Sequence, residues 1–109
     1  MTTVSFHMEE SRITGFEVKG HSGFAEEGKD IVCASVTSAI RLVECAINDV
    51  LGLCAAVKVS ESRASISLKL PGGLSASADN TCQSVLTGLM VYLTELHEEY
   101  PDNIQVMEV

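Results

Sequence analysis

The sequence is short of basic residues, with 7 Lys and Arg against 15 Asp and Glu and a net charge of −8. Such a chain repels phosphate backbones, and no Lys and Arg cluster with interleaved aromatic residues offsets this. Tryptophan is missing, and aromatic residues make up only 5% of the chain. These absences argue against direct binding to nucleic acid and favour a cationic protein as partner.

Targeting and membrane signals are also missing. No basic segment opens the chain, and no stretch approaches the roughly 18 apolar residues that a membrane span needs. The four cysteines, at positions 33, 45, 54 and 82, form no CxxC pair. Without a secretion signal, free thiols are the default and structural zinc is not expected. We therefore expect a soluble cytoplasmic protein with no metal or other cofactor.

The 109 residues, 46% of them apolar, are enough for one compact domain over residues 1–109. Alternating apolar residues predict strands, and apolar residues at steps of three and four predict helices. The expected elements are strands 2–8 and 13–19, a helix over 31–53, strands 56–60 and 64–70, a helix from 79 or 80 to 100, and a final strand 104–109. This ββαββαβ order predicts an α+β fold, a mostly antiparallel or mixed sheet packed against two long helices.

Each expected helix carries one apolar stripe that should face the sheet. We expect Asp30 to cap the start of the first helix, and Pro101 ends the second. The first stripe comprises Val32, Val36, Ile40, Val43, Ile47 and Val50, and the second comprises Cys82, Val85, Leu89, Leu93 and Leu96. Between the first hairpin and the first helix, residues 20–29 contain three glycines, which predicts a mobile loop.

Helical geometry separates the thiols. Cys82 lies within an apolar stripe, which predicts an inert buried thiol, whereas Cys45 lies roughly opposite the other stripe and should be exposed or at a subunit contact. Cys54 receives no role. His7 and His97 are expected to be surface or hydrogen-bonded histidines, because three scattered histidines do not make a metal site.

Among the four cysteines, Cys33 is the candidate for a reactive, catalytic thiol. With Asp30 as cap, it occupies the third helical position, where unpaired backbone N–H groups and the helix dipole stabilise a thiolate. Taken alone, the position suits a small core residue better. His21, twelve residues upstream, makes a Cys–His pair possible if the loop folds across the helix start. We expect Asp30 chiefly to cap the helix and, in addition, to orient the His21 ring.

Other catalytic signatures are missing: the sequence has no G-x-S-x-G elbow, no G-x-G-x-x-G and no Walker sequence. What it has is Gly20-His21-x-Gly23 followed by Gly28-x-Asp30-Ile31-Val32-Cys33-Ala34, which leads straight into a long helix. This pattern resembles the ribosomal-processing cysteine protease family called Prp, and the resemblance covers the whole chain.

The resemblance implies a bacterial endopeptidase that removes a short N-terminal extension from large-subunit ribosomal protein twenty-seven. It further implies that Cys33 is the nucleophile, that His21 is the general base and that the protein is a homodimer. The backbone N–H of Cys33 and its neighbours would form the oxyanion hole. The loop would act as a lid over the substrate, through Gly20, Ser22, Gly23, Phe24 and Gly28, with Phe24 against apolar substrate residues.

Two other functions stay open on the sequence alone. In a non-catalytic module for ribosome assembly, Cys33 and His21 would be structural residues. In a thiol-based redox enzyme, Cys33 would need a resolving thiol, and none lies near it unless Cys82 or a partner subunit supplies one. For the protease, the net charge of −8 complements the strongly cationic substrate expected of a ribosomal protein.

Overall fold

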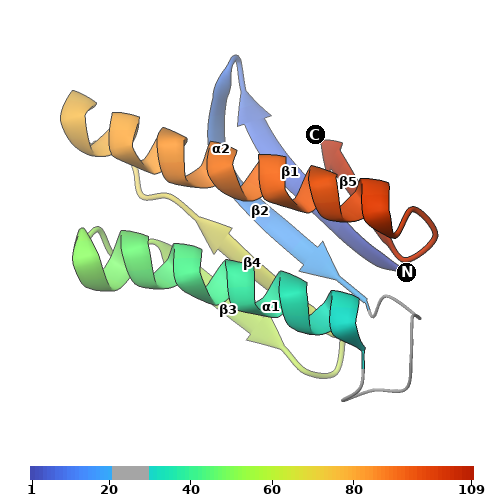
Figure 1. Cartoon of the computed structure of the whole chain (residues 1–109). Coiled ribbons are helices and arrows are strands. Elements are labelled where there is room, and N and C mark those ends of the chain that lie inside the picture. Colours follow the sequence, from blue (N-terminus) through green and yellow to red (C-terminus); the bar gives the residue numbers. More distant parts are fainter. Residues whose placement is uncertain (21–29) are drawn as a thin grey trace.

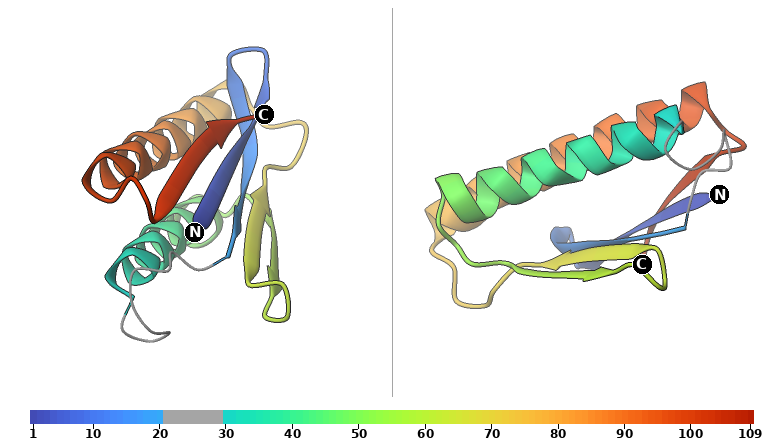
Figure 2. Two further views of the ribbon diagram at one scale, coloured as in Figure 1. Left: turned by 90° about the vertical axis from the view of Figure 1, so that its right-hand side faces the viewer. Right: turned by 90° about the horizontal axis from the view of Figure 1, so that it is seen from below.

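A computed structural model describes residues 1–20 and 30–109 of the chain. Its elements are β1 (Thr2–Glu9), β2 (Arg12–Lys19), α1 (Ile31–Glu44), the π-helix η1 (Cys45–Val50), β3 (Ala56–Ser60), β4 (Ser65–Lys69), α2 (Ala76–Glu99) and β5 (Ile104–Glu108). The five strands form a mixed sheet in the order β3-β4-β2-β1-β5, with β5 parallel to β1 and the other described pairs antiparallel. Both helices cover one face of this sheet (Figure 1, Figure 2). The expected α+β fold is confirmed.

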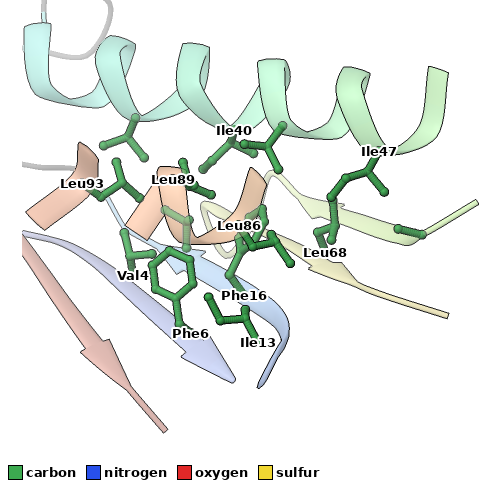
Figure 3. Close-up of a cluster of buried hydrophobic side chains, with 14 of the residues drawn as sticks. Val4, Phe6, Ile13, Phe16, Ile40, Ile47, Leu68, Leu86, Leu89 and Leu93 are labelled. Carbon is green, nitrogen blue, oxygen red and sulfur yellow. The ribbon is translucent and has the colours of Figure 1, made fainter. Parts of the chain in front are cut away.

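The core lies between the sheet and the two helices (Figure 3). Phe6 and Phe16 face each other across β1 and β2, with ring centroids 6.0 Å apart, and both are fully buried. Leu86 and Leu93 of α2 and Ile47 of η1 are also fully buried. Burying each such side chain contributes about 1.5–3 kcal/mol, so this layer holds the helices on the sheet.

The first helix begins where the sequence predicts and ends differently. Five of its six stripe residues are buried as expected, but Val50 is 78% exposed. The last six residues form η1, whose turns are wider than those of an α-helix, and this change of period rotates Val50 off the buried face. Helical structure ends at Val50, so the expectation of a helix to residue 53 is also wrong.

An amide side chain secures the exit from η1. Asn48 Nδ2 donates to the carbonyl oxygen of Ala55 at 3.1 Å, and Ala55 N–H donates to Asn48 Oδ1 at 2.7 Å. Both backbone groups of one buried residue are thereby satisfied by a single side chain. This clamp ties the helix end to the residue that precedes β3.

The second helix starts earlier than predicted. Ser75 caps it, with its Oγ accepting the Ala78 N–H at 3.1 Å, so the helix begins at Ala76 and the expected start at 79 or 80 is wrong. Leu86 is fully buried whereas Val85, placed in the expected stripe, is only half-buried. Leu86 lies four residues after Cys82 and three before Leu89, which is the better helical spacing.

The first hairpin is anchored to α2 by polar side chains. Gln83 clamps Ile13, accepting its N–H at 2.7 Å and donating to its carbonyl oxygen at 2.8 Å. Arg12 Nη2 lies 2.8 Å from Asp79 Oδ1, and hydrogen bonding to this guanidinium lowers the pKa of the Asp79 carboxyl. The start of β2 is therefore held against the first turns of α2.

The segment Ile31–Val50 has 20 residues and contains an 18-residue window with a mean hydropathy of 1.5, which by length and composition alone is enough to cross a membrane. The expectation that no segment approaches this limit is wrong. Core helices pass the same test, and here one face of the segment packs on the sheet through Val36 and Ile40. Only 28% of that window is buried, however, and Ile31 and Leu42 are large apolar side chains that the segment leaves exposed.

Candidate active site

The first turn of α1 brings Asp30 and Cys33 together. Cys33 N–H donates to Asp30 Oδ1 at 2.9 Å, and Ala34 N–H donates to the Asp30 carbonyl oxygen at 3.0 Å. Asp30 is only 6% exposed and Cys33 is half-buried. The structure thus confirms Asp30 as the N-cap and places the thiol at the positive end of the helix dipole.

The same hydrogen bond corrects one expectation. The Cys33 N–H is bound to the Asp30 carboxylate, so it is not free to stabilise an oxyanion as the sequence analysis supposed. A helix has four N-terminal amides without intrahelical acceptors, and those of Ile31 and Val32 precede Cys33 in this set. They are the amides of the first turn that remain as candidates for that role.

Gly20 ends β2 and shapes the chain just before His21. Its φ is +82°, and a Cβ atom would lie 2.8 Å from the Met1 carbonyl oxygen, so both conformation and space require glycine. Its N–H donates to the Ala64 carbonyl oxygen at 2.9 Å. The end of β2 lies at the same end of the molecule as the start of α1 (Figure 1). The residue that precedes His21 in sequence is therefore near the helix turn that carries Cys33.

The other predicted site residues lie outside the described residues: His21, Ser22, Gly23, Phe24 and Gly28. The expected mobile loop over residues 20–29 likewise falls there, except for Gly20. The Cys33–His21 pair and the orienting role of Asp30 stay predictions.

Comparison with known proteins shows which family the chain belongs to. Residues 1–105 match the family model described as cysteine protease Prp. The chain belongs to the cysteine protease Prp family. It is 31% identical over 94 residues to the ribosomal processing cysteine protease Prp of Bacillus subtilis strain 168, which covers 86% of this chain and 84% of that protein. Membership in the Prp family makes the chain a cysteine protease, a peptide hydrolase.

Solved structures show the same fold. The Staphylococcus aureus Prp protease, crystallised with a covalently linked product peptide, superposes with a TM-score of 0.82 at 23% identity, covering 100% of both chains. A Streptococcus mutans protein superposes with a TM-score of 0.84 at 21% identity, covering 100% of this chain and 94% of that one. The α+β sheet and helix pair are thus the Prp fold.

The other three cysteines differ from Cys33 as the sequence analysis predicts. None of the four cysteines, all of which lie within the described ranges, forms a disulfide. Cys82 is fully buried, and this burial raises the pKa of its thiol. Cys45 is exposed, and a hydrogen bond to Asp49 raises the pKa of its thiol. Cys54 is exposed at a φ of 56°.

The two other histidines also match expectation. His7 is exposed on β1, and His97 Nδ1 is hydrogen-bonded to the Ile104 carbonyl oxygen. Across residues 1–20 and 30–109, no three His, Cys, Asp or Glu side chains come close enough together to hold a metal ion.

A groove of about 1060 Å³ between α1 and α2 was not foreseen from the sequence. Among its lining residues are Ile31 and Leu42 of α1 and Gly88 and Tyr92 of α2, and within residues 1–20 and 30–109 Asp30 is the sole carboxylate or basic group in the lining. Leu42 is nine residues after Cys33, about two and a half helical turns, so the two side chains leave α1 on opposite sides. The groove is therefore separate from the thiol's side of the helix.

Proposed function

We propose that this chain is a cytoplasmic ribosomal-processing endopeptidase with a Cys33–His21 dyad, and that it removes the N-terminal extension of large-subunit ribosomal protein twenty-seven. One observation carries the proposal: in a chain that matches the Prp family over residues 1–105, Cys33 occupies the first turn of α1 under an Asp30 cap. The Bacillus subtilis relative, 31% identical, is described as a ribosomal processing protease.

The chemistry follows from a thiolate–imidazolium pair. The Cys33 thiolate attacks the carbonyl carbon of the scissile peptide bond, and first-turn amides stabilise the resulting oxyanion. The C–N bond breaks, the departing amine takes a proton from the His21 imidazolium, and the acyl group stays on sulfur as a thioester. His21 then takes a proton from water, the hydroxide attacks the thioester, and the C–S bond breaks to restore the thiolate.

Alkylation with iodoacetamide tests the thiolate directly, and mass spectrometry separates the rates of the four thiols. We expect Cys33 to react faster than Cys45 at neutral pH although Cys33 is the more buried of the two. If Cys33 is alkylated no faster than Cys45, the result would contradict the protease and favour the alternative of a non-catalytic binding module.

Cleavage of a peptide that spans the extension of ribosomal protein twenty-seven tests the substrate. Cys33→Ala and His21→Ala should both abolish cleavage, whereas Cys54→Ala, at an exposed thiol, should retain it. Retained cleavage by Cys33→Ala would remove the nucleophile assignment. Cleavage of unrelated peptides at the same kcat/KM would contradict the assignment of ribosomal protein twenty-seven as the specific substrate, but it would support the protease activity.

We further propose that two copies pair through the groove between α1 and α2. The chain has a net charge of −8, and this groove lets two acidic copies meet where, among the residues that the structure describes, the buried Asp30 is the sole carboxylate in the lining. Leu42, 71% exposed, is the most prominent apolar side chain there. Association through a nearly uncharged apolar surface avoids the repulsion that the rest of the surface imposes.

Sedimentation velocity tests this pairing. Leu42→Arg should convert a dimer into a monomer, whereas Val59→Arg, at a valine that is 67% exposed on β3, should leave the dimer intact. A dimer that survives the Leu42 change, or a wild-type monomer at micromolar concentration, would contradict this interface.

A further inference from the structure

A second groove lies between α2 and β5, on the side of the molecule where the sheet ends. Its volume is about 550 Å³, and its apolar lining consists of Met90 and Val91 from α2 and Val106 and Met107 from β5. Three carboxylates and a hydroxyl complete the lining: Glu95, Glu98, Glu108 and Thr94. The lining contains no basic side chain, so the groove combines an apolar floor with one sign of charge.

The backbone of β5 is open on this side. Among the described strands β5 is the last of the sheet, paired only with β1 (Figure 2). Thr2 N–H donates to the Asn103 carbonyl oxygen and Val109 N–H donates to that of Phe6, so the odd-numbered residues of this segment face β1. Because backbone groups alternate along a strand, Val106 and Glu108 direct their N–H and C=O groups to the open edge.

The opposite edge of the sheet is different. There β3 carries Lys58, and charged Lys residues on edge strands commonly block pairing with other chains. The segment from Ile104 to Val109 contains no Lys, Arg or Pro. The β5 edge thus lacks that protection and is lined by carboxylates that attract a basic chain.

We propose that this groove is a docking site for an extended, positively charged peptide segment, which adds to the sheet as a sixth strand beside β5. Main-chain hydrogen bonds to Val106 and Glu108 would supply affinity, and side chains on the α2 side would supply specificity. Apolar residues pack against Met90 and Val106, and Lys or Arg residues pair with Glu95 and Glu98. The proposal concerns binding and does not depend on the Cys33 thiol.

The position of the groove gives a consequence that rests on the proposed function. The carboxyl end of α2, which carries Glu95 and Glu98, lies at the same end of the molecule as the start of α1 (Figure 1). A basic protein docked along β5 can therefore extend toward Cys33. The β5 groove would hold the body of a cationic substrate while the thiol acts on another part of it.

Fluorescence anisotropy of a labelled peptide tests the docking on the full chain. The probe has eight residues: threonine at odd positions, and lysine and valine in turn at even positions, so that one face of the strand carries both basic and apolar side chains. We expect saturable binding that weakens as salt rises, and no binding of the same peptide with glutamate in place of lysine. Equal binding of both peptides would overturn the proposal.

N-methylation of the probe tests strand addition itself. One version is methylated on the amides of its odd residues, and the other on those of its even residues. Only one edge of the probe can pair with β5, so one version should lose binding by about tenfold or more and the other should stay within about twofold. Which version fails reports whether the added strand is antiparallel or parallel. Equal loss in both would exclude a strand.

Two variants place the site. Glu95→Gln with Glu98→Gln should weaken binding about fivefold at low salt, whereas Glu10→Gln with Glu61→Gln makes the same charge change on distant turns and should leave binding unchanged. Val106→Pro removes an open N–H without removing a β1 hydrogen bond and should also weaken binding. If instead Val106→Pro dissociates a dimer in sedimentation, a second copy covers β5 and the proposal fails.

Discussion

The two ends of the first helical segment each carry a cysteine, and their surroundings are opposite. At the amino end, Cys33 is half-buried beneath the Asp30 cap, with its N–H hydrogen-bonded to that carboxylate. At the other end, Cys45 is exposed in η1, where Asp49 raises the pKa of its thiol. The first end lies at the positive pole of the helix dipole, whereas at the second a neighbouring carboxylate acts on the thiol. We expect the less exposed thiol, Cys33, to be the more reactive of the two.

The largest difference should appear in catalysis. Cys33→Ala should reduce kcat/KM for the ribosomal peptide by about 10⁴-fold or more, because a missing nucleophile leaves only binding and electrostatic stabilisation. Cys45→Ala, the matched change at the other end of the segment, should leave kcat/KM unchanged. Peptide cleavage followed by mass spectrometry measures both, and equal losses would show that the two ends do not differ in function.

Breaking the clamp at the carboxyl end should affect stability alone. Asn48→Ala leaves the N–H and C=O of Ala55 without their partner, at a cost of about 2 kcal/mol in the free energy of unfolding. Asn80→Ala, on the exposed side of α2, serves as the control. Urea unfolding measures the loss, and the alkylation rate of Cys33 should be the same in both variants. A slower Cys33 in Asn48→Ala would couple the two ends.

Removing the cap at the amino end should affect both stability and reactivity. Asp30→Ala should lower the free energy of unfolding by about 1 kcal/mol, because the first-turn amide loses its acceptor. It should also slow the alkylation of Cys33 if, as predicted, Asp30 orients the His21 ring that forms a pair with the thiol. Ser75→Ala removes the matching cap of α2, with a similar loss of stability and no change at Cys33. If the two cap variants alkylate at the same rate, Asp30 has only a capping role.

The smallest effect concerns Cys45. Asp49→Ala should return the raised pKa of Cys45 toward its ordinary value, which increases the thiolate fraction and the alkylation rate below that pKa. The gain should disappear at high pH, where the thiol is ionised in both proteins. Glu44→Ala should give a smaller gain, because Glu44 contributes least to the shift. A pH series of alkylation rates checks the order.

Much of the fold follows from local patterns in the sequence. Alternation placed Phe6 and Phe16 on the buried face of the first hairpin, and the spacing of Val32, Val36 and Ile40 gave the buried face of α1. Asp30 marks the start of this helix because a short carboxylate satisfies its first amides. Ser75 offered the same signal for α2 and was missed.

Features that depend on contacts distant in sequence, or on local conformational detail, were not predictable. The clamp of Gln83 on Ile13 joins residues 70 positions apart, and the exposure of Val50 follows from a local change in helical period. The loss of the Cys33 N–H as an oxyanion donor follows from the side-chain conformation of Asp30, which spacing does not determine. The groove between α1 and α2 could not be predicted, because its shape depends on how the two helices lie relative to each other.

The pairing of β1 with β5 has a consequence for how the molecule is made. Residues 2–6 take their parallel partner from residues 104–108, so the ladder on that side of β1 cannot form until residues 104–108 have left the ribosome. Met1 also abuts Gly20, the residue ahead of His21. A nascent chain that ends before β5 therefore lacks one of the two strands that flank β1, and we expect thiol activation to await the synthesis of β5.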